Sequence, residues 1–191
     1  MFDDIPDKTE DKNTTSLKFK KDLFNFFKNK KLKNILEIGS NHGWTTRILS
    51  DLGESIYSID NTQSNIEYCK KNNPDKNNIN WICGDAYANE TYLNLPKYFD
   101  LVFIDCIHEF QWVIADINRA LSFRDPAGKI YLAFDDYAHP ISTGVFQAVN
   151  EAVKHGLKIE QYIGEGEGFE FGKDFTRRLL RDEGLILSYE K

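Results

Sequence analysis

Glycines and acidic residues follow the short apolar runs of this chain, where they could bind a nucleotide-like ligand. Gly39 and Gly43 flank a polar turn directly after the run Ile35–Ile38. Backbone N–H groups at such a turn can approach a ligand closely, and a helix N-terminus favours negative charge. Asp60 closes the next apolar run, about twenty residues after the first glycine, where a carboxylate can bind ribose hydroxyls. Asp85 follows the third run, where it either hydrogen-bonds an adenine amino group or caps the next helix.

Two histidines follow later apolar runs, and an imidazole there could move a proton. His108 comes shortly after Asp105, and His139 follows the pair Asp135 and Asp136. A neutral imidazole near pH 7 can accept the proton of an attacking hydroxyl. For His108, catalysis or ligand binding and a role at a helix start both stay open, whereas for His139 we favour a loop role.

The elements that must position these residues alternate along the chain from Ser16 onward. Apolar runs bounded by turn residues predict strands, and apolar residues at helical spacing predict helices. The expected strands are Ile35–Ile38, Ser55–Ile59, Ile79–Cys83, Phe99–Asp105, Lys129–Phe134, Leu157–Ile163 and Leu185–Tyr189. After a first helix from Ser16, the expected helices are Trp44–Leu52, Thr62–Asn72, Tyr87–Leu93, Glu109–Phe123 and Ser142–His155. This alternation predicts an α/β fold: a doubly wound, mostly parallel sheet with helices on both faces and an antiparallel last strand.

Length and composition predict one folded domain. The 191 residues are 41% hydrophobic and 14% aromatic, which is enough for a substantial core. Residues 1–15 are mostly polar or charged, so we expect them to form a flexible N-terminal tail. Residues 16–191 are expected to form a single domain.

Charge and cysteine usage limit the partners and the compartment. The net charge of −6 makes nucleic acid an unlikely partner, because phosphate binding draws on clustered Lys and Arg. The three cysteines are unevenly spaced and lack a paired C-x-x-C pattern, which argues against a disulfide framework or a zinc site. The chain starts without an apolar signal core and has no run long enough to span a bilayer. We therefore expect a soluble, cytoplasmic protein that does not bind membranes, whose oligomeric state is open.

The turn after the first strand resembles a known cofactor motif. A nicotinamide-type G-x-G-x-x-G fails here, because Asn41 and Trp44 stand at its second and third glycine positions. Glu37, Gly39 and Gly43 instead match the E-x-G-x-G-x-G motif of class I S-adenosylmethionine-dependent methyltransferases, with Asn41 at the middle glycine. Asn is among the few residues that tolerate a left-handed backbone, so the turn can survive this change.

The resemblance is closest to the small-molecule O-methyltransferase-like branch of that class. There the motif relaxes to E-I-G-S-x-x-G-x-[ST]-T, which residues 37–46 follow. The run 99–105 with His108 after it, then Gly128 and the strand end 134–137, are also similar to that branch. The resemblance covers residues 32–160 and implies the methyltransferase fold, S-adenosylmethionine as cofactor and methyl transfer as activity.

The resemblance also implies roles for individual residues. Those that would bind the cofactor are Glu37, Gly39, Ser40, Asn41, Gly43, Asp60, Asp85, Ala86 and Asp105. Glu37 would orient the turn or bind the methionine amino group, Asp60 would hold the ribose, and Asp85 with Ala86 would border the adenine. Asp105 and His108 would be the catalytic residues. Trp44 is expected to pack in the core rather than to touch ligand.

A metal site is a separate implication. In the family's sheet order the fourth and fifth strands are neighbours, about 4.8 Å apart, so acids at their ends would meet beside the methyl donor. Carboxylates so close share a proton, recruit a cation or face away from each other. Such an oxygen-rich site suits Mg²⁺, which related enzymes use to acidify a substrate hydroxyl. Asp105, Asp135 and Asp136 are the candidate ligands, with one of the last two pointing in. The alternative is that these acids only cap helices and turns.

The expected function is therefore O-methylation of a small-molecule hydroxyl, with S-adenosylmethionine as methyl donor and Mg²⁺ as a candidate helper. Aromatic residues after the strands could line an acceptor pocket, and a glycine-rich loop at 164–172 could close over it; the aromatics are Phe110, Tyr137, Phe169 and Phe171. The alternatives are a non-catalytic binding protein that retains the fold, a nicotinamide-dependent oxidoreductase, and a methyltransferase acting on protein or nucleic acid.

Overall fold

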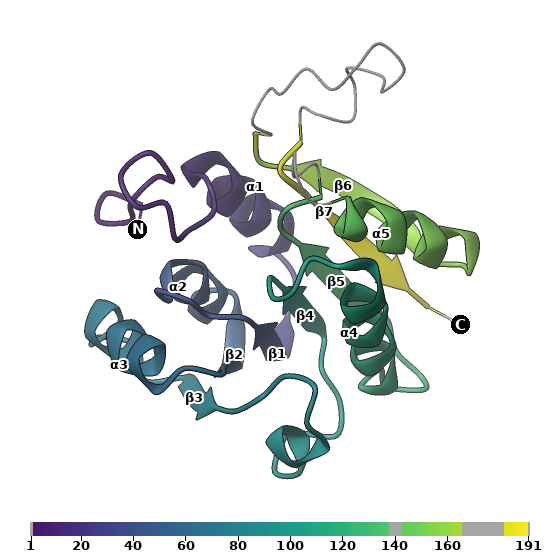
Figure 1. Ribbon diagram of the computed structural model, residues 1–191, viewed down its shortest axis with the longest axis horizontal. Helices are drawn as coiled ribbons and strands as arrows, with labels where there is room; N and C mark the ends of the chain where they lie inside the picture. The colour runs from purple at the N-terminus through teal and green to yellow at the C-terminus, as the bar shows by residue number, and fades with distance from the viewer. Residues whose placement is uncertain (1, 138–142, 166–181, 191) are drawn as a thin grey trace.

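The structure is a computed structural model that describes residues 2–137, 143–165 and 182–190, and it contains a seven-stranded sheet (Figure 1). The strands are β1 (Leu32–Ile38), β2 (Gly53–Asp60), β3 (Ile79–Cys83), β4 (Leu101–Ile104), β5 (Ile130–Phe134), β6 (Lys158–Ile163) and β7 (Gly184–Tyr189). Their order is β3-β2-β1-β4-β5-β7-β6; β7 runs antiparallel to both of its neighbours, β5 and β6, and the other pairs are parallel. The expected doubly wound sheet with an antiparallel last strand is confirmed.

Helices cover both faces of this sheet, as Figure 1 shows. They are α1 (Leu17–Phe27), α2 (Trp44–Ser50), α3 (Gln63–Asn72), α4 (Phe110–Ser122) and α5 (Gly144–Lys154). The expected helix at 87–93 is shorter than predicted, because only Asn89–Tyr92 form a 3₁₀ turn, η1. The expected strand at 99–105 is likewise shortened to its four most apolar residues.

Two apolar layers hold the helices to the sheet. Along β4, Leu101 and Phe103 face the layer under α1 and α2, while Val102 and Ile104 face the layer under α4 and α5. All four side chains are buried, as expected for a strand covered on both faces. Because β1 and β5 flank it, β4 ends in the middle of the sheet edge, between the ends of both neighbours.

Residues 2–15, which we call the N-terminal strap, pack against the domain, whereas the sequence led us to expect a flexible tail. Ile5 is only 4% exposed. The Lys20 ammonium is buried and donates to the carbonyl oxygens of Pro6 (3.0 Å) and Thr15 (2.6 Å). The polar groups of the strap bond to α1, to α2 and to the turn before α2, so its packing leaves no periodic apolar signal in the sequence.

None of the helices in the described ranges is long and apolar enough to cross a membrane. Some expectations fall on residues that the structure does not describe. His139, Phe169, Phe171 and most of the expected 164–172 loop lie outside the described residues.

Candidate functional site

The turn between β1 and α2 has the left-handed backbone that the glycine spacing indicated. Gly39 has a φ of 91°, Asn41 of 45° and Gly43 of 77°. Asn41 therefore takes the conformation expected of it in place of the middle glycine. A Cβ at Gly39 would lie 1.8 Å from the backbone oxygen of Asp105, so that position admits only glycine.

Hydrogen bonds fix this turn on the side that faces α3. The carbonyl oxygen of Asn41 accepts from the Cys69 thiol, and that of His42 accepts from the Asn72 amide. The carbonyl oxygen of Gly43 accepts from the Asn73 amide (3.0 Å). Residues 69–73 thus hold three successive carbonyl oxygens of the turn.

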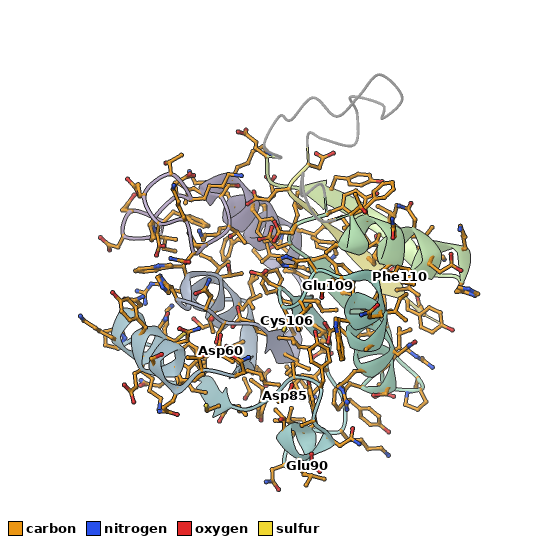
Figure 2. The ribbon with its side chains drawn as sticks, in the orientation of Figure 1. Asp60, Asp85, Glu90, Cys106, Glu109 and Phe110 are labelled. Atoms are coloured by element: carbon orange, nitrogen blue, oxygen red, sulfur yellow. The ribbon has the colours of Figure 1, made fainter. Side chains whose placement is uncertain are left out.

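A cleft of about 340 Å³ opens beside the turn, at the carboxyl ends of the first four strands. Its lining residues are Gly39, Asn41, Ile59, Asp60, Asn61, Asn65, Gly84, Asp85, Ala86, Tyr87, Asp105, Cys106 and Ile107. Figure 2 shows Asp60, Asp85 and Cys106, which come from the ends of β2, β3 and β4. Six of the residues expected to bind cofactor line this cleft: Gly39, Asn41, Asp60, Asp85, Ala86 and Asp105.

Asp60 lines the cleft and also accepts a hydrogen bond from the turn. Its carboxylate accepts from the backbone N–H of Asn41 (3.0 Å) and of Thr62 (2.9 Å). The Asn65 amide donates to the same carboxylate (3.1 Å) and also lines the cleft. Sequence reasoning missed Asn65, although its place in the first turn after Thr62 faces the strand end.

Three expected cofactor residues do not line the cleft. Glu37 is buried beneath the turn, where it accepts hydrogen bonds from the hydroxyls of Thr46 and Ser58. Burial raises the pKa of Glu37 to about 8. Its contacts join β1, α2 and β2, so it supports the turn from below. Ser40 is buried within the turn, and Gly43 begins α2 close to Cys69.

The ends of β4 and β5 bring together two carboxylates and an imidazole. Asp105, His108 and Asp136 each offer one ligand atom, and these atoms lie within 4.8 Å of one another. His108 Nε2 is 3.1 Å from Asp136 and 3.6 Å from Asp105. The neighbouring carboxylates, first that of Asp105 and then that of Asp136, raise the pKa of His108 above its ordinary value.

Asp135 and Asp136, which follow β5, lie in two different environments. Asp136 has a φ of 54°, and this left-handed residue directs its side chain toward His108. Asp135 is buried next to the cluster, and its Oδ1 has no hydrogen-bond partner among the described residues. Burial, followed by the charges of Asp105 and Asp136, raises the pKa of Asp135 well above its ordinary value. Of the three candidate metal ligands, Asp105 and Asp136 thus lie together with His108, and Asp135 lies buried beside them.

One buried acid behind the cleft was also missed from the sequence. Tyr87 lines the cleft, and its hydroxyl donates to Asp116 of α4 (3.4 Å). Burial raises the pKa of Asp116 to about 7. The signal was present, because Asp116 stands between Val113 and Ile117 on the apolar face of its helix.

The sequence matches a family model over residues 36–137, which includes the turn, the cleft and the acid–histidine cluster; its description is methyltransferase domain. The chain belongs to the methyltransferase domain family. No curated protein sequence matches this methyltransferase domain. Its fold is that of the class I, S-adenosylmethionine-dependent methyltransferases, as the resemblance of the turn implied.

Solved structures with the same fold include O-methyltransferases. The O-methyltransferase from Bacillus cereus in complex with SAH has a TM-score of 0.67 and 18% identity, over 90% of this chain and 80% of that chain. The O-methyltransferase TomG from Streptomyces achromogenes, involved in tomaymycin synthesis and in complex with SAM, has a TM-score of 0.67 and 17% identity, over 94% and 82%. Aeropyrum pernix fibrillarin, with natively bound S-adenosyl-L-methionine, has a TM-score of 0.56 and 20% identity, over 83% and 66%.

Proposed function

We propose that this domain transfers a methyl group from S-adenosylmethionine to a hydroxyl oxygen of a small molecule. The cofactor occupies the 340 Å³ cleft, with its ribose at Asp60 and its adenine beside Asp85 and Ala86. The absence of a Cβ at Gly39 lets the cofactor approach the backbone between β1 and β4. This placement follows the rule that ligands bind outside the carboxyl ends of strands in open α/β sheets.

The position of Asp105 carries the proposal. Asp105 lines the cleft and also lies 3.6 Å from His108 Nε2, so the acid–histidine cluster borders the place proposed for the cofactor. An imidazole there can accept a proton from a hydroxyl that faces the donor methyl group. Asp105 and Asp136 would stabilise the imidazolium that forms.

The chemistry needs alignment more than activation of the donor, because the sulfonium is already reactive. The substrate oxygen attacks the methyl carbon, the bond from that carbon to sulfur breaks, and the sulfonium becomes a neutral thioether. The hydroxyl proton goes to the imidazole of His108. The turn and the end of β4 would hold the reacting atoms in line, which is the main contribution a protein can make to such a transfer.

The residues present fit a divalent cation. Asp105 and Asp136 offer carboxylate oxygens within 4.8 Å of each other, and the buried Asp135 Oδ1 beside them has no hydrogen-bond partner in the described ranges. Oxygen donors of this kind suit Mg²⁺ or Mn²⁺. When bound, the ion would hold the substrate oxygen and lower the pKa of its hydroxyl. Asp105 and Asp136 would hold the ion, with Asp135 or His108 as the third donor.

A small molecule is the acceptor that the charge of the chain favours. The net charge of −6, and the acids grouped at the cluster, would repel a phosphate backbone. Aromatic side chains stand near this edge: Phe110 is exposed at the start of α4, while Tyr137 is buried against Phe146. These rings could border an acceptor beside the cluster.

Calorimetry with S-adenosylhomocysteine tests the cofactor, and methyl transfer to a broad panel of hydroxylated small molecules tests the reaction. We expect micromolar binding at one site and turnover with some hydroxylated acceptors. Failure of the wild-type chain to bind would refute the proposed function. Binding without turnover over the whole panel, together with an Asp105→Ala variant that binds equally well, would favour a non-catalytic binding protein.

A further inference from the structure

The N-terminal strap reaches the cofactor turn through the carboxylate of Asp11. One oxygen of Asp11 accepts from both His42 Nδ1 (2.7 Å) and Trp44 Nε1 (3.1 Å). The other oxygen accepts from the backbone N–H of Asn13 (2.9 Å). Partial burial raises the pKa of Asp11, but these hydrogen bonds, first that of His42, outweigh burial and lower it to about 2. Asp11 is therefore ionised while it holds the two side chains.

The position of Asp11 is set by the fold on both sides of it in the chain. Before it, Ile5 is buried and the carboxylate of Asp7 accepts from the N–H of Leu17 (2.9 Å). After it, Thr15 is held by the Lys20 ammonium through its carbonyl and by Thr45 through its hydroxyl (3.3 Å). The contact with His42 and Trp44 is thus made by an anchored loop.

The strap and α3 hold the turn from different directions. The His42 ring stacks on Tyr68 of α3, with centroids 4.9 Å apart, while its Nδ1 meets Asp11. Between these supports, Asn41 lines the cleft and donates its N–H to Asp60. Asn41, which lines the cleft, is therefore next in sequence to His42, which Asp11 holds.

This support matters because the turn is costly to keep in one conformation. Three of its residues have positive φ values, and one of them, Asn41, carries a side chain. Without support, the turn would occupy other conformations, and binding a ligand would have to restore this one at a cost in free energy. A contact that holds the turn in the free protein removes part of that cost.

We propose that Asp11 is a positioning residue of the cofactor site, which holds His42 and Trp44 so that residues 39–43 stay in the conformation that receives S-adenosylmethionine. Asp11 is then part of the cofactor-binding machinery, although it lies in the N-terminal strap and outside the cleft. The proposal rests on the proposed function, since S-adenosylmethionine is the ligand of the cleft there. Linkage makes it reciprocal: if the strap improves cofactor binding, the bound cofactor must stabilise the strap by the same factor.

Calorimetry with S-adenosylhomocysteine on full-length variants tests this. Asp11→Ala removes both acceptor oxygens, and Asp11→Asn keeps one. Asp3→Ala is the matched control, because it removes the same charge from an exposed position of the same strap. We expect Kd to rise about tenfold in Asp11→Ala, by less in Asp11→Asn, and by less than about twofold in Asp3→Ala. Adding His42→Phe to Asp11→Ala should weaken binding little further, because the aromatic ring beside Tyr68 is kept and the contact with Asp11 is already broken.

Hydrogen exchange gives a second readout that a general loss of stability would not reproduce. In the ligand-free protein, Asp11→Ala should speed exchange at residues 39–47 and leave β5 and α4 unchanged. In the wild type, S-adenosylhomocysteine should slow exchange within residues 5–15. Wild-type binding with equal Kd and equal turn exchange in Asp11→Ala and Asp3→Ala would overturn this proposal and leave the proposed function intact. No binding by the wild type would overturn both.

Discussion

His108 lies between two carboxylates at the border of the cleft, and its neighbours define its role. It contacts Asp105 from its own loop and Asp136 from the end of β5, but it is not among the residues that line the cleft. Removal of its imidazole should therefore affect proton transfer and leave cofactor binding almost unchanged.

We expect His108→Ala to lower kcat about 100-fold or more, which is the usual contribution of a general base. The Kd for S-adenosylhomocysteine should change by less than about twofold, because the contacts of the cleft remain. Steady-state turnover and calorimetry on the same preparation measure the two effects. Turnover that survives the substitution would assign the proton to another acceptor.

The buried carboxyl of Glu37 makes the stability of the fold depend on pH. Its folded-state pKa of about 8 lies above the ordinary value of 4.5. Between these values the unfolded chain has released the proton while the folded chain keeps it, so the wild type loses stability as pH rises through this window. Glu37→Gln keeps an acceptor for Thr46 and Ser58 and has no such proton.

We expect the free energy of unfolding of Glu37→Gln, relative to the wild type, to increase by at least about 1 kcal/mol between about pH 5 and about pH 8. Urea denaturation at both pH values measures this difference. A difference that does not depend on pH would mean that Glu37 is ionised in the folded protein.

At the scale of elements, the turn between β1 and α2 requires glycine at position 39 but only a left-handed backbone at position 41. A Cβ at Gly39 meets the backbone of Asp105, which cannot move without shifting β4. Asn41 has no such requirement, because its side chain is exposed and only its backbone is in the left-handed region.

Gly39→Ala should therefore abolish measurable binding of S-adenosylhomocysteine and lower the melting temperature. Asn41→Gly should keep Kd within about threefold, because glycine takes the same backbone conformation without strain. Calorimetry and thermal unfolding of the two variants compare them directly. Normal binding by Gly39→Ala would remove the turn from the cofactor site.

The same comparison shows why some elements were predictable from the sequence. Gly39, Asn41 and Gly43 meet a local backbone requirement, so their spacing alone predicted the turn. The strands were predictable because short segments rich in apolar and aromatic residues are bounded by turn residues. The role of Asp11 was not predictable, because its partner His42 is 31 residues away in the sequence. A polar segment that packs through single hydrogen bonds also shows no periodicity. The contact between Asp136 and His108 was not predictable either, because it depends on the left-handed backbone of Asp136 after the end of β5.

At the scale of the whole molecule, the sheet order divides the site into two parts that share one edge. The ends of β1, β2 and β3 supply the turn, Asp60 and Asp85, which are proposed to bind the cofactor. The ends of β4 and β5 supply the acid–histidine cluster. Asp105 belongs to both parts, because β4 lies between β1 and β5.

This division predicts that cofactor and metal binding can be lost separately. Asp60→Asn loses one of the two oxygens that hold the N–H groups of Asn41 and Thr62, so it should weaken S-adenosylhomocysteine binding at least about tenfold. Asp136→Asn keeps a residue that tolerates a left-handed backbone and removes one charge from the cluster. It should bind the cofactor product normally and lose any stabilisation by Mn²⁺ or Mg²⁺.

Thermal unfolding of both variants, with S-adenosylhomocysteine alone and with the metal alone, tests whether the two binding functions are separable. A ligand at about 100 times its Kd stabilises the fold by about 2.7 kcal/mol, which is several degrees in a domain of this size. We expect Asp60→Asn to lose the shift caused by S-adenosylhomocysteine and to keep the metal shift, and Asp136→Asn to show the reverse. If neither metal shifts the wild type and EDTA leaves turnover unchanged, Asp105 and Asp136 act only on His108, and the proton transfer proceeds through the imidazole alone.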